Sequence, residues 1–324
     1  MPVRRLSAVA ALLAVAAVLL LAIDRGRDPL AGLRVMVPNA PGSGYDVTAR
    51  TLAKALEDAG LVRGVEVFNL PGAGGSVGVQ RLVYERGRGS LLMLMGLGVV
   101  ASEHSGATAA LRETTPIARL IQEPNMIVVT RDAPFRTLSD LVTAWREAPA
   151  SVPVGGGSLP GGPDHLAPML LARAIGVAPP TVRYERYDGG GELLAAILGK
   201  RVAFGVSGVG EYADQVRTGT LRVLAVTGPA RVPGLDAPTL REAGVDLEFA
   251  NWRGIIAPPG LHAEDARALR ELVDRLVRSA QWRAALARNG WSDAYLGGPA
   301  FDRFLAQERA RLDAVMSDLG LTAT

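Results

Sequence analysis

The chain has 324 residues, 48% of them hydrophobic and 21% charged, so a packed globular fold of one large or two ordinary domains is expected. It has no cysteine, which excludes disulfides, thiolate metal sites, a cysteine nucleophile and a lipid-anchor cysteine. The formal charge of +3 lies in the first 27 residues, where four arginines face one aspartate. The remainder is electrically balanced, which argues against a nucleic-acid partner.

The first residues have the order of an export signal. A basic start, MPVRR, precedes an unbroken apolar run over residues 6–23. This run reaches the lower length limit for a membrane-spanning helix, and it ends without the small residues of a cleavage site. We therefore assign residues 1–31 to a signal or uncleaved anchor plus linker, with the bulk of the chain outside the cytoplasm. The alternative is a buried core helix.

Strand-like and helix-like segments alternate after this linker. Periodicity predicts strands at residues 33–38, 65–70, 90–96 and 125–132, and helices at 45–60 and 76–87. A less regular stretch separates the strand at 90–96 from residues 116–124, which precede the strand at 125–132. The strand at 90–96 is wholly apolar, as in a sheet buried on both faces. Such alternation predicts βαβ units and an open parallel sheet.

The pattern restarts in the second half. Strands are expected at residues 151–157, 181–188, 202–208, 221–228 and 247–256, and helices at 164–176, 192–201, 211–219, 263–290 and 299–320. We predict an α/β protein of two domains, with residues 32–130 plus 249–324 in domain 1 and residues 131–248 in domain 2. Extended crossings near residues 127–130 and 249–256 would form a two-strand hinge that lets the domains close on a ligand.

Two glycine-rich turns carry the functional signal. GSG precedes Tyr45, and GAGGS precedes Val77, each between a predicted strand and a predicted helix. Free N–H groups and partial positive charge at a helix start bind anions, and glycine lets a carboxylate or phosphate approach. Ser43 and Ser76 add hydroxyl donors. The competing interpretation is that these are tight turns in which glycine serves only backbone geometry.

Other chemistries have little support. Gly72, Gly74 and Gly78 give only a loose dinucleotide pattern, with no acidic residue after the next strand. GVSGV at residues 205–209 lacks the final glycine of a nucleophile elbow, and the three histidines stand far apart. We expect no cofactor and no metal.

Several polar residues remain open between two interpretations. His165 begins a helix after a third glycine-rich turn, where it contacts either solvent or the ligand. Asp46 is favoured as a partner of its helix start over a ligand contact, and Asp188 as a helix cap over a residue facing the cleft. Trp252 and Arg253 either pack the hinge or contact the ligand.

The segments VPNAPGSGYDVTAR, NLPGAGGSVG, GGSLPGGPDHL, VRYERYDGGGELLAAILGKRV, GTLRVLAVTG and APTLREAGVDLEFANWRGIIAPPGL occur in the order seen in one receptor family. Over residues 33–320 the chain resembles the extracytoplasmic solute receptors of tripartite tricarboxylate transporters. The resemblance implies a type II periplasmic-binding-protein fold and a di- or tricarboxylate ligand. It also implies a two-component membrane permease as partner, and we expect a monomer that performs no chemistry.

The resemblance also implies a ligand-binding set. The first two turns would hold one carboxylate, and the opposing lobe would select the ligand's far end. The predicted residues are Pro41, Gly42, Ser43, Gly44, Tyr45, Asp46, Gly72, Ala73, Gly74, Gly75, Ser76, Gly157, Ser158, His165 and Ser207.

The chain departs from the family pattern at two places outside this set. The third strand ends in Gly96-Leu97-Gly98 instead of a hydroxyl residue, and Asp188 stands where a cation is usual. Two alternative functions stay open: a ligand-sensing partner of a membrane signalling protein, and an exported small-ester hydrolase that would use Ser207.

Overall fold

A computed structural model describes residues 30–104, 106 and 110–321. The predicted signal or anchor at residues 6–23 lies outside the described residues. Among the residues described, no helix is long and apolar enough to cross a membrane.

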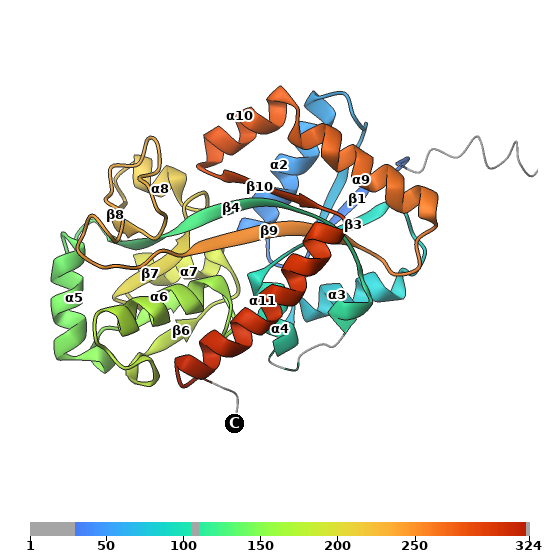
Figure 1. Cartoon of the computed structure of the whole chain (residues 1–324). Coiled ribbons are helices and arrows are strands. Elements are labelled where there is room, and N and C mark those ends of the chain that lie inside the picture. Colours follow the sequence, from blue (N-terminus) through green and yellow to red (C-terminus); the bar gives the residue numbers. More distant parts are fainter. Residues whose placement is uncertain (1–29, 105, 107–109, 322–324) are drawn as a thin grey trace, which may run out of the picture.

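The chain forms an α/β structure of two lobes joined by two long strands, which confirms the predicted fold class (Figure 1). The strands are β1 Arg34–Val37, β2 Glu66–Asn69, β3 Leu91–Gly96, β4 Thr115–Thr130, β5 Val154–Gly156, β6 Tyr184–Arg186, β7 Phe204–Gly208, β8 Leu221–Val226, β9 Ala250–Ala257 and β10 Ser292–Gly297. The helices are α2 Gly44–Asp58, α3 Ser76–Tyr84, α4 Leu97–His104, α5 Leu138–Glu147, α6 Pro163–Ala174, α7 Gly190–Leu198, α8 Ala213–Arg217, α9 Ala263–Val277, α10 Ala280–Asn289 and α11 Pro299–Asp318.

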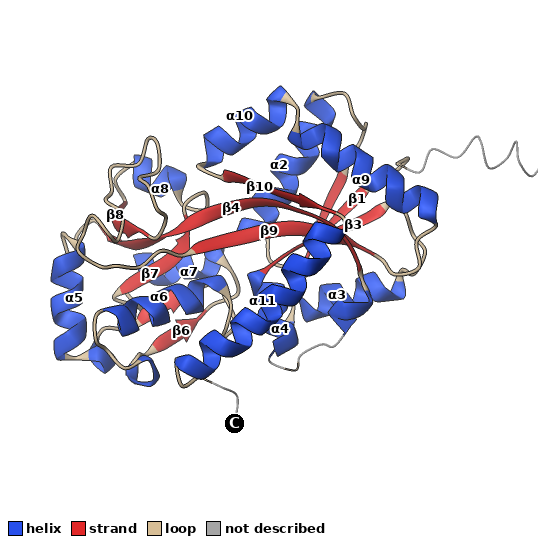
Figure 2. Ribbon diagram, in the orientation of Figure 1, coloured by secondary structure: helices blue, strands red, loops and turns tan. Residues whose placement is uncertain are grey.

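The first lobe is built on the order β2-β1-β3-β9-β4, and the second on β4-β7-β5-β6. Strand β4 belongs to both, because its first part pairs with β9 and β10 and its second part with β7 and β8. Figure 2 shows β4 and β9 running side by side through the middle of the molecule, with helices packed outside the strands. These two strands form the hinge.

The prediction of a parallel sheet was wrong in part. β1 pairs in parallel with β2 and β3, and β5 with β6 and β7, as expected of βαβ units. However, β9 runs antiparallel to both β3 and β4, because the chain returns to the first lobe from the opposite end. All six residues of β3 are buried, which confirms its expected place in the interior.

Candidate functional site

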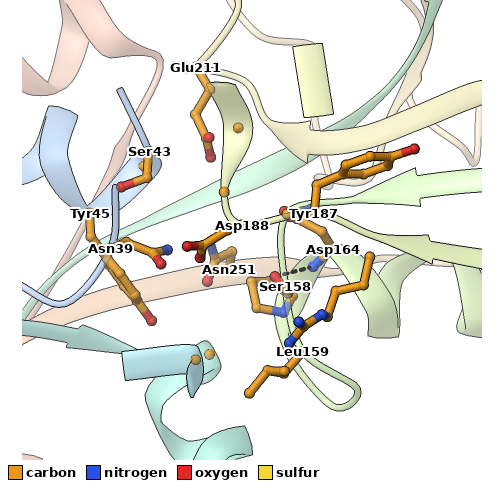
Figure 3. Close-up of a pocket in the computed structure, with 18 of the residues that line it drawn as sticks. Asn39, Ser43, Tyr45, Ser158, Leu159, Asp164, Tyr187, Asp188, Glu211 and Asn251 are labelled. Carbon is orange, nitrogen blue, oxygen red and sulfur yellow. Dashed lines mark hydrogen bonds between the residues drawn. The ribbon is translucent and has the colours of Figure 1, made fainter. Parts of the chain in front are cut away.

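A cavity lies between the two lobes, at the carboxyl ends of the parallel strands, where open α/β sheets bind ligands (Figure 3). Its lining comes from the loops into α2, α3, α6 and α7, from the start of α4, from the loop after β7, and from hinge strand β9. The lining residues are Asn39, Ser43, Gly44, Tyr45, Gly74, Gly98, Gly157, Ser158, Leu159, Pro163, Asp164, Arg186, Tyr187, Asp188, Gly189, Gly190, Glu211, Asn251 and Arg253.

The first glycine-rich turn forms the start of α2. Ser43 is the N-cap, and its hydroxyl accepts a hydrogen bond from the Asp46 N–H at 3.3 Å. Asp46 accepts in turn from the Gly42 N–H at 2.9 Å and from Arg50, and these donors lower the pKa of its carboxyl. Asp46 therefore supports the turn, while Gly44 faces the cavity.

The second turn, before α3, holds glycines that are required by their backbone. Gly74 and Gly75 have φ of 64° and 98°, in the left-handed region. A Cβ atom on Gly74 would lie 2.8 Å from Cγ of Leu159, which belongs to the second lobe. The two lobes thus touch at this turn.

The cavity brings together six of the predicted binding residues: Ser43, Gly44, Tyr45, Gly74, Gly157 and Ser158. The other nine do not line it: Pro41, Gly42, Asp46, Gly72, Ala73, Gly75, Ser76, His165 and Ser207. Most of these nine shape the turns behind the lining.

His165 is buried under Tyr184, at a ring distance of 4.8 Å, and its Nδ1 accepts the Gly161 N–H at 3.1 Å. Burial lowers its pKa to about 4, so the ring is neutral. Ser207 is fully buried on β7 and away from the cavity. These positions do not support a solvent-facing His165 or a Ser207 nucleophile.

The Tyr45 side chain lies beside Gly96, the last residue of β3, and Gly98 in α4. Cβ atoms on Gly96 and Gly98 would each lie 3.1 Å from Oη of Tyr45. Burial raises the pKa of this phenol to about 12. A phenol hydroxyl from α2 therefore stands where the family pattern has a hydroxyl residue at the strand end.

Sequence analysis missed a buried cluster of charges at the hinge. Arg253 on β9 pairs with Glu123 on β4, and its Nη1 donates to Oγ1 of Thr48 at 3.1 Å. Glu123 also accepts from Nε1 of Trp291 at 2.9 Å. Glu211, from the loop after β7, lies 3.6 Å from Nη2 of Arg253.

Asp164 completes this cluster at the start of α6. It accepts from Nδ2 of Asn125 at 2.9 Å and from the Gly157 N–H at 3.0 Å. Burial raises the pKa of Asp164 to about 6, and that of Glu211 to about 8. We call Glu123, Asp164, Glu211 and Arg253 the hinge cluster. Only Glu123 and Arg253 lie in or beside the predicted crossings, so the sequence held no signal for the whole cluster.

Asp188, Trp252 and Arg253, each left with two interpretations by the sequence, lie in different surroundings. Asp188 lines the cavity, and the following helix is capped by Gly189 without a side chain, so the favoured capping role was wrong. Trp252 packs between α11 aromatic rings, 5.0 Å from Phe304, whereas its neighbour Arg253 faces the cavity. Trp252 therefore packs the hinge, and Arg253 faces the cavity.

The fold and cleft define a two-lobed binding protein, and comparisons with known proteins agree. The profile of the family described as "Tripartite tricarboxylate transporter family receptor" matches residues 48–321. The chain belongs to this family.

Similar proteins include BugT of Bordetella pertussis, 26% identical over 302 residues, covering 90% of each chain. The solved structure of the periplasmic binding protein BugD has a TM-score of 0.80 at 22% identity, covering 90% of this chain and 99% of that one. Rpa4515 of Rhodopseudomonas palustris, solved with adipate, has a TM-score of 0.79 at 25% identity, and the match covers 89% of this chain and 97% of that one. These similarities extend over both lobes.

Proposed function

We propose that the protein is an extracytoplasmic receptor for a small organic carboxylate of the di- or tricarboxylate class. The observation that carries this proposal is the cavity between the lobes, into which the starts of α2, α6 and α7 open. N–H groups at helix starts bind carboxylates. Among the relatives, MatC was solved with malate and Rpa4515 with adipate.

Binding would proceed by closure of the lobes, without chemistry. The Gly44 and Gly74 turns belong to the first lobe, and Gly157 and Ser158 to the second, so a ligand between them contacts both. A ligand that contacts both lobes stabilises the closed state by its differential affinity. We further propose domain boundaries at residues 130/131 and 248/249, which fall near the points where β4 enters the second lobe and β9 re-enters the first.

The closed, liganded form would then deliver its ligand to a two-component permease of the tripartite tricarboxylate type. Residues 1–31 would direct export or anchor the receptor. Delivery is tested with labelled ligand and proteoliposomes that hold such a permease, where uptake should depend on added receptor.

Ligand class is tested by a thermal-shift screen of dicarboxylates, tricarboxylates, amino acids and aromatic acids, with neutral sugars as the negative control. A ligand at 100 times its Kd stabilises the folded state by about 2.7 kcal/mol. We expect a dose-dependent rise in Tm with a di- or tricarboxylate and none with neutral sugars. Stabilisation by neutral sugars alone would contradict the proposal.

A further inference from the structure

Glu211 places a carboxyl group inside the cavity, where the ligand's carboxylate is proposed to bind. Figure 3 shows this side chain pointing from the loop after β7 into the cavity. A Cβ atom on Gly44, at the start of α2, would lie 2.7 Å from its Oε1, and one on Gly190, at the start of α7, would collide with its Oε2. The carboxyl group thus lies between helix starts of the two lobes.

The charges around Glu211 do not balance. Three carboxyl groups of the hinge cluster share one guanidinium, and all four side chains are buried. Arg253 is already paired with Glu123, and its nearest nitrogen stays 3.6 Å from Glu211. An ionised ligand carboxylate would add a fourth negative charge in the same desolvated space.

We propose that Glu211 binds the ligand as a neutral acid, so that the receptor takes up one proton from solvent together with each organic anion. The Glu211 O–H then donates to the ligand's carboxylate, because two carboxyl groups in contact in a desolvated site hold one proton between them. No covalent bond forms or breaks. This inference rests on the proposed function and makes Glu211 a specificity-determining residue.

The electrostatics of the cluster agree with this assignment. Burial raises the pKa of Glu211 most, and Asp164 and Glu123 raise it further, whereas Arg253 and the Gly208 backbone lower it, with a net value of about 8. Tyr45 from α2 and Tyr212 from the same loop also face the cluster, and both phenols are neutral because burial raises their pKa. Asp188 and Arg186 line the cavity from the turn into α7.

The direction of the pH dependence follows. Separation of the lobes would return Glu211 to water, where the ordinary pKa of a glutamate is 4.5. Because the pKa is raised in the closed form, closure is favoured below it and weakens as pH rises toward it. Anion affinity should fall by about tenfold per pH unit well below pH 8, the slope for one linked proton, and the dependence should level off as pH passes 8.

Calorimetry of the full chain tests the proposal. Succinate, adipate, citrate and aspartate are titrated between pH 6.5 and 8.5 in buffers of different ionisation enthalpy, which reports the protons taken up. We expect uptake close to one proton for the binding carboxylate at pH 6.5, falling as pH rises through 8. Glu211→Gln, which mimics the neutral acid, should bind without uptake and with a flat pH profile, while Glu271→Gln, on exposed α9, should behave as the wild type.

Three results would overturn the inference. Carboxylate binding by the wild type without proton uptake would show that ligand binding does not protonate Glu211. Tighter binding of aspartate than succinate, lost at least tenfold in Glu211→Gln, would show that an ionised Glu211 binds an ammonium group. If neither the wild type nor Glu211→Gln binds any carboxylate across this pH range, the proposed function is refuted, and the inference with it.

Discussion

Gly74→Ala should weaken ligand binding by at least 30-fold while leaving the fold intact. The added Cβ atom would occupy the space of the Leu159 side chain, with its Cγ only 2.8 Å away, so the lobes could not approach as closely as the structure shows. The same methyl group would cover N–H groups of the turn before α3. Because closure is proposed to hold the ligand between the lobes, a block at this contact should reduce affinity more than stability. Titration calorimetry measures the affinity, and a thermal melt the stability.

Two further variants separate backbone strain, the clash with Leu159 and the blocking of N–H groups as causes of weaker binding. Gly60→Ala is the control for backbone strain, because Gly60 has φ of 65°, against 64° for Gly74, and nothing lies within 4 Å of its added Cβ. Gly60→Ala and Gly74→Ala should each lose about 1–2 kcal/mol of folding stability, because alanine is strained in the left-handed conformation. Adding Leu159→Ala to Gly74→Ala should restore affinity if the clash is the cause, and should not if the methyl group blocks N–H groups. Wild-type affinity in Gly74→Ala would contradict the placement of the ligand.

Local sequence patterns were sufficient to predict the turns that form the cavity. In α2, apolar residues at three- and four-residue spacing and a glycine after the helix predicted one element, and the structure adds Ser43 as its N-cap. The same kind of signal located β3, α6 and α7. Because parallel strands place their carboxyl ends on one edge, the order of these elements already indicated where ligands bind.

Elements without such patterns were missed. Strand β10 is a short run without a clear apolar alternation, with only Ala294 buried, and it exists through pairing with β4. Helix α4 follows β3 without a loop, so its residues looked like the end of the strand. The single strand β4 was predicted as two segments, residues 116–124 and a strand at 125–132. The structure tolerates Pro116 beside a register shift and places Pro124 where the strand passes between lobes.

The hinge cluster could not be predicted because its members are distant in sequence. Glu123 and Arg253 meet only because β4 and β9 pair antiparallel, and Glu211 reaches them from the second lobe. A single charged residue beside a strand is compatible with solvent exposure. Only the register of the two hinge strands brings these charges into one buried group.

Arg253→Met should destabilise the protein by about 3–5 kcal/mol, the usual cost of leaving a buried charge without its partner. Glu123 would lose its only ion pair among the residues that the structure describes, with its side chain fully buried. Asp164 and Glu211 would also lose the positive charge that lowers their pKa, so their folded pKa would rise further above the unfolded one. Such stability is lost as pH rises, so urea unfolding should show a larger defect at pH 8 than at pH 6.

A compensating variant tests whether charge, and not lost packing, is responsible. Glu123→Gln combined with Arg253→Met removes both charges but keeps an oxygen for the Trp291 N–H, so most of the lost stability should return. Arg241→Met is the surface control, because Arg241 is 57% exposed beside Asp246 and Glu248 and should cost less than 1 kcal/mol. If Arg253→Met costs no more than this control, Glu123 does not carry a charge in the native protein. In that case one ionised carboxylate fewer would surround Glu211, and the excess negative charge that favours its protonated form would be smaller.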